Sequence, residues 1–326
     1  MPRPKGVAME YWIFNHQLQF RFPFRIAHGL RTHTAVVYLQ LRLGGHTAWG
    51  EAALPPYLPE TQASVGHFIQ SFLQVHPNWQ PEQLLAALQA EQTNMPARAA
   101  LDMALHSLLA QTKPGHSLLL PLAAAPQPPS FYTISACTSQ VEMQMRVQHG
   151  LQNGFTHFKL KLIDENIASM LDWFRACTAQ PFAVDANQSW QSVTAAVALS
   201  HTLQQQGCLF LEQPFAKENL AASAALKRKS ALPVFADESC QRIYQLPALA
   251  EAFDGVNIKL MKCGGLTEAY GMIQEARALG LKVLIGCMSE SSVGCNSAAA
   301  LAPLCDYADL DGPFLITNDF DATQWV

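Results

Sequence analysis

The sequence predicts an α/β protein in which a (β/α)7β TIM-like barrel follows a smaller N-terminal α+β domain. Between residues 131 and 309, short apolar runs alternate with helical stretches, which is typical of βα units and a parallel sheet. An ionisable residue ends most of these runs, about 25 residues after the previous one. The chain before them consists of predicted strands followed by predicted helices, the order typical of an α+β domain.

The N-terminal domain is predicted to begin with an antiparallel hairpin. Residues 11–24 and 34–43 alternate apolar and polar side chains, as half-buried strands do. A short strand at 48–53 follows, and a cluster of prolines ends it in a loop. Helical spacing of apolar residues then predicts helices at residues 61–75, 81–92 and 97–110.

A proline-rich linker is predicted to separate this domain from the barrel. We therefore expect the first domain at residues 1–125, the barrel at 126–312, and a C-terminal segment at 313–326 that packs back on the first domain. No G-x-G-x-x-G motif follows an apolar run, so a dinucleotide-binding fold lacks support. Eight apolar runs favour a closed barrel over an open sheet, and they lie at residues 131–136, 157–162, 182–185, 209–212, 234–237, 255–260, 282–285 and 306–309.

The composition argues against nucleic-acid and membrane partners. The chain carries 21 Lys or Arg and 25 Asp or Glu, so its net charge is −4 and only 14% of its residues are charged. No apolar run approaches the roughly 20 residues of a membrane helix, and the N-terminus does not resemble a signal peptide. Eight cysteines form no C-x-x-C pair, which indicates reduced thiols in a cytoplasmic protein. All eleven histidines lie at or before His201, so a site in the last third lacks His-ligated zinc and Ser-His-Asp chemistry.

The ionisable residues that end the predicted strands are the main functional signal. In a (β/α) barrel the carboxyl ends of the strands surround one mouth, where the active sites of this fold lie. In chain order these residues are Lys159 and Lys161, Asp185, Glu212, Asp237, Lys262, Glu290, and Asp309 with Asp311.

Three of them are carboxylates on consecutive strands, Asp185, Glu212 and Asp237. Three converging carboxylates would repel one another unless they share a cation. Hard oxygen ligands without His or Cys favour Mg²⁺, with Mn²⁺ as an alternative. Each carboxylate could instead cap a helix N-terminus, but three in consecutive units favour the metal.

The lysines flank this triad. Lys159 and Lys161 lie two residues apart on one predicted strand, so both point to the same face. A neighbouring ammonium and a nearby cation disfavour protonation of Lys161, as a general base requires. Lys262 is predicted to come from the opposite side of the barrel, so the two lysines could act on opposite faces of one carbon. Ion pairing is the alternative for either lysine, and Lys259 is either structural or close to the site.

In this order the motifs resemble those of the enolase superfamily, in its muconate-lactonizing subgroup, and most closely its dipeptide epimerases. The resemblance covers nearly the whole chain. FKLKL resembles the K-x-K strand, VNIKLMKCGGLTEA the strand of the opposing lysine, and DLDGP the D-x-D motif. VDANQSW, EQP and ADES resemble the three metal-ligand strands, and PFRIAHGLRTHT and WGEAALPPYLPET the specificity loops of a capping domain.

This resemblance implies an isomerase that moves a proton at the C-terminal α-carbon of a dipeptide through an enediolate. It assigns Mg²⁺ to the carboxylate triad, proton transfer to Lys161 and Lys262, and support of Lys161 to Lys159. Asp309 and Asp311 would hold the substrate's α-ammonium, although Asp before Gly-Pro also starts turns. The resemblance allows a homo-oligomer and leaves the preferred substrate side chain open.

Four further residues are candidates for substrate contact: Thr133, Arg31, Met288 and Glu290. The Thr133 hydroxyl could instead form its hydrogen bonds within the strand, and Glu290 could cap the following helix. Arg31 is predicted to lie with Tyr57 in the loops over the mouth, where its side chain could instead be solvated. Muconate cycloisomerase, o-succinylbenzoate synthase and N-acylamino acid racemase activities are alternatives on the same scaffold, and their substrates lack a free α-ammonium. A non-catalytic small-molecule binding protein is disfavoured because the lysines and the triad are all present.

Overall fold

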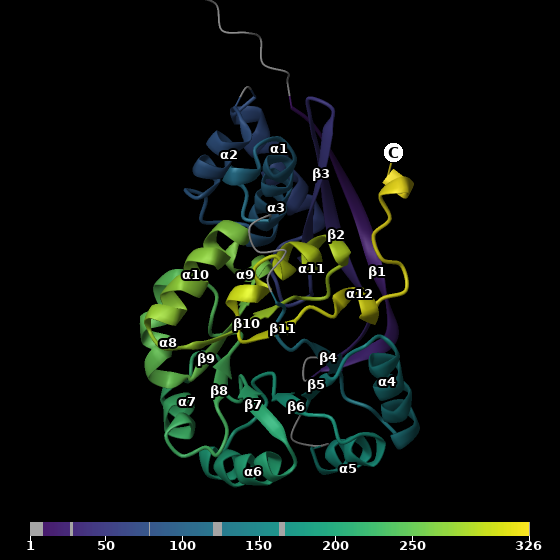
Figure 1. The fold of residues 1–326 in the computed structure, drawn as a ribbon, viewed down its shortest axis with the longest axis vertical. Helices are drawn as coiled ribbons and strands as arrows, with labels where there is room; N and C mark the ends of the chain where they lie inside the picture. The colour runs from purple at the N-terminus through teal and green to yellow at the C-terminus, as the bar shows by residue number, and fades with distance from the viewer. Residues whose placement is uncertain (1–8, 27–28, 78, 120–125, 163–166, 326) are drawn as a thin grey trace, which may run out of the picture.

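The computed structural model describes residues 9–26, 29–77, 79–119, 126–162 and 167–325 (Figure 1). An antiparallel sheet of order β1-β2-β3 comes first and consists of β1 (Glu10–Ile26), β2 (Gly29–Leu43) and β3 (His46–Leu54). Three helices pack beside it, α1 (Gln62–Val75), α2 (Pro81–Leu88) and α3 (Met95–Thr112), with α3 against β3.

Residues 36–41 of strand β2 are buried on both faces, whereas the sequence predicted a half-buried hairpin. Val37 and Leu39 face the helices and join the core formed with α1 and α3. Val36 and Tyr38 face the other way and join the core of the barrel. Because successive side chains of a strand alternate between faces, the sheet serves two cores at once and fixes the N-terminal unit to the barrel.

The second sheet is parallel and has the order β11-β10-β9-β8-β7-β6-β5-β4. It closes through a parallel bridge between Ser130 and Ala308, whose N–H donates to the Pro129 carbonyl at 2.9 Å. The predicted α/β barrel is therefore confirmed. Its strands are β4 (Phe131–Ile134), β5 (His157–Lys161), β6 (Phe182–Asp185), β7 (Cys208–Glu212), β8 (Val234–Ala236), β9 (Gly255–Lys259), β10 (Lys282–Gly286) and β11 (Tyr307–Asp309).

Helices follow the strands around the outside of the barrel (Figure 1). They are α4 (Gln140–Gln152), α5 (Ile167–Cys177), α6 (Val193–Gln205), α7 (Leu220–Lys227), α8 (Leu246–Ala252), α10 (Leu266–Ala278) and α11 (Ser292–Ala299), with the short α9 (Leu260–Cys263) and α12 (Gly312–Leu315). Short 3₁₀ turns occur at Pro114–His116, Ile243–Gln245, Ala302–Leu304 and Ala322–Trp325. No helix in the described ranges combines the length and the apolar character needed to span a membrane.

The interior of the barrel is apolar at one end and polar at the other. A cluster of buried apolar side chains fills the first end and consists of Phe131, Ala183, Phe210, Phe235 and Leu284. Two residues further along the strands, the interior-facing positions are polar and include Thr133, Asp185, Glu212 and Asp309. The apolar layer closes the barrel, so a ligand can enter only at the polar mouth, at the carboxyl ends of the strands.

The segment after the barrel runs back along the N-terminal sheet, at the side of β1 (Figure 1). Ile316 forms an antiparallel bridge with Phe20, and the Thr317 N–H donates to the Gln19 carbonyl at 2.9 Å. The Phe320 ring lies 4.9 Å from the ring of Tyr38. These contacts join the end of the chain to its beginning.

Two buried glutamates lie where the N-terminal sheet meets the barrel. Glu51 of β3 accepts hydrogen bonds from the Ser291 N–H at 2.9 Å, the Ser291 hydroxyl at 2.6 Å and the Gly294 N–H at 2.9 Å. Glu290 accepts one from the Met288 N–H at 2.6 Å. Burial raises the pKa of Glu51 to about 7, and burial and then Glu51 raise the pKa of Glu290 to about 8.

We expect Glu290 to make the stability of the protein depend on pH. Its folded-state pKa lies above the ordinary 4.5, so the folded protein keeps a proton that the unfolded chain releases. This contribution is complete below about pH 4.5 and is lost as the pH rises to about 8. Since one pKa unit is worth about 1.4 kcal/mol and nearly all of the interval from pH 5 to pH 8 lies between the two pKa values, Glu290→Gln should stabilise the protein by about 3–4 kcal/mol more at pH 8 than at pH 5. Urea unfolding at both pH values measures this, and an equal effect at both would contradict it.

Candidate active site

The polar mouth of the barrel contains a cavity of about 370 Å³. Residues from both the barrel and the N-terminal sheet line it, so the two units together make the site. Among the predicted site residues, the lining includes Arg31, Thr133, Lys159, Lys161, Asp237, Lys262, Met288, Asp309 and Asp311. Asp185 and Glu212 are fully buried at the neighbouring strand ends, and Glu290 does not line the cavity.

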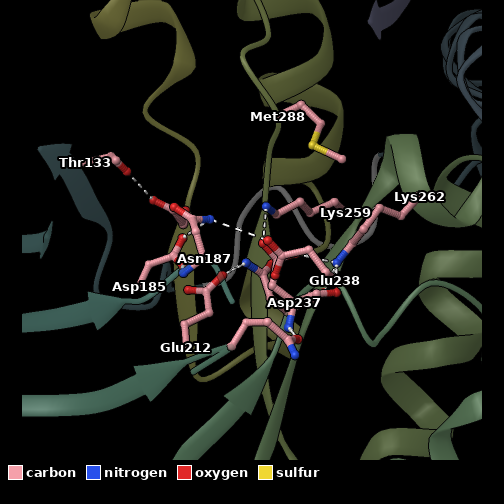
Figure 2. A network of polar contacts seen from close by, with 12 residues as sticks. Thr133, Asp185, Asn187, Glu212, Asp237, Glu238, Lys259, Lys262 and Met288 are labelled. Atoms are coloured by element: carbon pink, nitrogen blue, oxygen red, sulfur yellow. Dashed lines mark hydrogen bonds and ion pairs between the residues drawn. The ribbon is translucent and has the colours of Figure 1, made fainter. Parts of the chain in front are cut away.

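The three carboxylates of the predicted triad converge at this mouth. Asp185 ends β6, Glu212 ends β7, and Asp237 directly follows β8, and each offers an oxygen within 4.8 Å of the others. All three are buried, and Figure 2 shows them at the ends of neighbouring strands. A buried set of hard oxygen donors without His or Cys fits Mg²⁺, and a shared cation would offset the mutual repulsion of three anions so close together. The donor set therefore fits the predicted metal.

Amide side chains after two of these carboxylates shape the loops. Asn187 and Gln213 have the left-handed φ values of 43° and 37°, which are uncommon for residues other than glycine. The Gln213 Oε1 accepts the N–H groups of Asp237 at 2.9 Å and Ser239 at 3.1 Å, and thereby fixes the start of the loop after β8. We did not predict a role for either residue, although each closely follows a triad carboxylate in VDANQSW and EQP.

The lysines of β5 both point into the mouth, as the alternation of side chains predicted. Lys161 Nζ lies 2.6 Å from Asp185 Oδ2 and 3.3 Å from Asn187 Oδ1. Lys159 Nζ lies 3.2 Å from Glu212 Oε2 and also donates to Asp309. Burial would lower the pKa of Lys159, but Asp309 and then Glu212 outweigh it and raise this pKa well above its ordinary value.

On the opposite side of the barrel, the strand-end lysine is Lys259. We expected Lys262 to end this strand, but β9 ends at Lys259 and the chain then turns into α9, which contains Lys262. Lys259 Nζ lies 2.7 Å from Asp237 Oδ2 and lines the cavity. Lys262 Nζ approaches Asp237 from α9, as Figure 2 shows, and donates to the Asp237 carbonyl and Oδ1 at 2.6 Å each and to the Asn257 carbonyl at 2.9 Å.

The carboxylates of the mouth differ in how their charge is compensated. Burial alone would raise the pKa of Asp237, but Lys259 and then Lys262 outweigh it and hold this pKa well below its ordinary value. Burial raises the pKa of Glu212 to about 7, against the opposing effect of Lys159. Burial and then Asp237 raise the pKa of Glu238 to about 7, and the Oε2 atom of Glu238 has no hydrogen-bond partner among the described residues. The lysines therefore compensate the charge of Asp237 more completely than that of Glu212 or Glu238.

Asp309 and Asp311 stand at the end of β11, beside β4. The Thr133 hydroxyl donates to Asp309 Oδ1 at 3.1 Å, and the Thr133 N–H donates to Asp311 Oδ2. Burial and then Asp309 raise the pKa of Asp311 to about 7. Thr133 thus orients both carboxylates, and both line the cavity.

Arg31 of the N-terminal sheet and Tyr57 of the turn after β3 line the mouth from the N-terminal unit. Arg31 lies in β2 rather than in the loop we expected, because the hairpin extends further than the apolar alternation indicated. Its guanidinium lies 5.4 Å from the centre of the Phe24 ring and 3.5 Å from the Ser289 hydroxyl. The Nε and Nη1 atoms of Arg31 are buried and have no hydrogen-bond partner within the described part of the chain. The Tyr57 hydroxyl lies 3.0 Å from Met288 Sδ and joins the N-terminal unit to the loop after β10.

Comparison with known proteins agrees with this architecture. A family model for the mandelate racemase / muconate lactonizing enzyme N-terminal domain matches residues 8–119, and one for enolase C-terminal domain-like proteins matches 142–313. The chain is 38% identical to an L-Ala-D/L-Glu epimerase of Bacteroides thetaiotaomicron over 96% of its length and 82% of that protein. It is 34% identical to the L-Ala-D/L-Glu epimerase of Escherichia coli K12 over 95% of both chains.

A crystal structure of a dipeptide epimerase from Methylococcus capsulatus, complexed with Mg and the dipeptide L-Arg-D-Lys, superimposes with a TM-score of 0.85. It is 29% identical in sequence, and the match covers 96% of this chain and 93% of that one. The predicted resemblance is thereby confirmed, and the chain belongs to the mandelate racemase / muconate lactonizing enzyme family of the enolase superfamily.

Proposed function

We propose that this protein is a Mg²⁺-dependent dipeptide epimerase that inverts the α-carbon of the C-terminal residue. One observation carries the proposal: lysines end β5 and β9, which lie four strands apart in the eight-stranded order, with the acidic triad on the strands between them. A substrate held over the triad would therefore have one ammonium on each side. The relatives named as dipeptide epimerases support the same reaction.

In this proposal Lys161 and Lys259 exchange the proton. One amine removes the α-proton at its Nζ, and the ammonium on the other side returns a proton to the opposite face, which inverts the carbon. We assign the second role to Lys259 rather than Lys262 because Lys262 already donates to three acceptors, the full donor capacity of an ammonium. Lys259 has one described hydrogen-bond partner and lines the cavity.

Asp185, Glu212 and Asp237 would hold the Mg²⁺, and Mn²⁺ is the alternative ion. When bound, the ion supplies positive charge that stabilises the negative charge developing on the substrate carboxylate as the proton leaves. Asp309 and Asp311 accept hydrogen bonds from the substrate's α-ammonium, and Thr133 keeps them oriented. Muconate and succinylbenzoate substrates have no ammonium to donate to these carboxylates, and Asp311 has no lysine partner among the described residues, whereas Asp309 pairs with Lys159.

Residues 1–125 act in this proposal as the capping domain, 126–312 as the catalytic barrel, and 313–326 as a segment that joins the two. Tyr57 and Arg31 exclude water from the mouth when a substrate is bound. The eight cysteines, all unpaired, fit a reducing compartment, so we place the enzyme in the cytoplasm.

A screen of L-Ala-L-Xaa dipeptides with Mg²⁺ tests the proposed reaction. We expect chiral chromatography to show the C-terminal epimer of at least one dipeptide, and no turnover of N-acyl amino acids, which lack the α-ammonium. Turnover of the N-acyl compounds alone would overturn the proposal.

Arg31 selects an acidic side chain in this proposal. Its buried and unpartnered N–H groups need an acceptor, and two relatives are named for L-Ala-D/L-Glu. A hydrogen bond to a charged group is worth about 1.5–3 kcal/mol. We therefore expect Arg31→Gln to lower kcat/KM for L-Ala-L-Glu about 10- to 100-fold and to change that for L-Ala-L-Leu little. Equal losses for both dipeptides would contradict the assignment.

A further inference from the structure

Asn257 lies directly beneath the acidic triad. It belongs to β9, is fully buried, and faces the barrel interior like Lys259 two residues later. Its Nδ2 donates to Glu212 Oε1 at 2.7 Å, the shorter of the two described hydrogen bonds to that carboxylate. Asn257 therefore fixes the orientation of Glu212 from a strand that contributes no triad carboxylate.

Lys262 performs the equivalent task for Asp237. Its ammonium donates to the Asp237 Oδ1, to the Asp237 carbonyl and to the Asn257 carbonyl. Because the first two acceptors belong to one residue, the lysine holds both the side chain and the backbone of Asp237. The third acceptor connects this contact to Asn257, so one chain of hydrogen bonds runs from Glu212 to Asp237.

Gly286 leaves room for the Asn257 amide. The two residues lie on the paired strands β10 and β9. A Cβ at position 286 would lie 2.4 Å from Asn257 Oδ1, closer than two such atoms can approach. A glycine on β10 is therefore required for the amide to keep its present position.

We propose that Asn257 and Lys262 are a positioning pair that holds Glu212 and Asp237 in the arrangement that binds the metal ion. The proposal rests on the proposed function in one respect, the assignment of these carboxylates to Mg²⁺. The pair acts through the two carboxylates, which repel each other and would otherwise move apart. Groups that orient the ligands of a metal in this way typically change its affinity 10- to 100-fold when they are removed.

Asn257→Leu tests the first half of the pair without changing charge. With Mn²⁺ as the probe and no substrate present, titration calorimetry should show an affinity about 10- to 100-fold weaker than that of the unmodified protein. Asn296→Leu, at an exposed position of α11, is the matched control and should bind Mn²⁺ normally. Gly286→Ala is a second variant that keeps Asn257 but displaces its amide, and it should weaken Mn²⁺ in the same direction. Affinities within twofold of the unmodified protein for both Asn257→Leu and Gly286→Ala would overturn the proposal.

Lys262→Met separates positioning from proton transfer. A positioning residue affects both directions of the reaction, so exchange of the α-proton with D₂O should fall by a similar factor for both epimers of a substrate. Selective loss for one epimer would instead make Lys262 a base and overturn its place in the pair. If the unmodified protein exchanges no dipeptide, the proposed function fails, while the Mn²⁺ titrations still decide whether Asn257 positions a metal ligand.

Discussion

Lys161→Met and Lys259→Met should each reduce epimerisation at least about 10³-fold, within the range by which a positioned general acid or base accelerates a reaction. Each lysine ends a strand on its own side of the acidic triad, so neither can reach the α-proton on the other face. Loss of one lysine therefore leaves the other able to exchange the proton that faces it. We expect each variant to exchange the α-proton of one epimer with D₂O and not of the other, and the two variants to differ in which epimer they exchange.

Lys282→Met is the matched control for both lysine variants. Lys282 is exposed at the start of β10, at the opposite end of the barrel from the mouth, and its loss should leave both exchanges unchanged. Selective exchange in Lys262→Met, together with unselective exchange in Lys259→Met, would show that the sequence-based assignment of the second base was right and that the present one is wrong.

Glu212→Gln should have an effect of similar size for a different reason. The substitution keeps the shape of the side chain and its contact with Asn257, but it removes one of three charges available to a cation. Because such a cation contributes several kcal/mol to the reaction, we expect a loss of activity of about 10³-fold and a weaker affinity for Mn²⁺. Chelation by EDTA should abolish the activity of the unmodified enzyme, and added Mg²⁺ should restore it.

Glu251→Gln, on the exposed face of the barrel, controls for the general loss of a negative charge and should be fully active. Full activity of the unmodified enzyme after exhaustive chelation would contradict a role for the triad in holding a catalytic metal ion.

The sequence was sufficient for the parts of the fold and site that repeat. Asp185 and Glu212 end strands in the predicted order because one βα unit follows another at a regular interval. The same interval predicted that the three carboxylates converge at one mouth, and their mutual repulsion suggested that they share a cation. Lys159 and Lys161 could be placed on one face because the period of a strand is two residues.

The sequence was insufficient to predict the structure where the backbone departs from the regular βα repeat. VNIKLMK contains two lysines three residues apart, and apolar spacing does not show that the strand ends at the first of them. The strand ends at Lys259 because the chain then forms the short helix α9, which ends in a tight turn at Gly264 with φ of 91°. The role of Asn257 could not be predicted either, because an apolar run does not indicate which carboxylate an asparagine within it will contact.

Arg31 and Glu290 illustrate the same limit for contacts between the two units. Arg31 enters the cavity because β2 begins earlier than the alternation of its apolar residues indicates. Glu290 was expected to contact substrate, but it is buried beside Glu51 of the N-terminal sheet and outside the cavity lining. Neither position follows from a local pattern, because each depends on how a sheet near the beginning of the chain packs on a loop near its end.

Deuterium incorporation into L-Ala-L-Glu in D₂O with Mg²⁺ tests two-base epimerisation most directly. Because the returning proton comes from the second lysine, whose ammonium exchanges with solvent, the product L-Ala-D-Glu should carry one deuterium at the C-terminal α-carbon. Nuclear magnetic resonance should show no deuterium at the alanine α-carbon and little in the substrate at early times. Absence of deuterium from the product, or its appearance at the alanine α-carbon, would contradict proton transfer by lysines on opposite faces of the C-terminal residue.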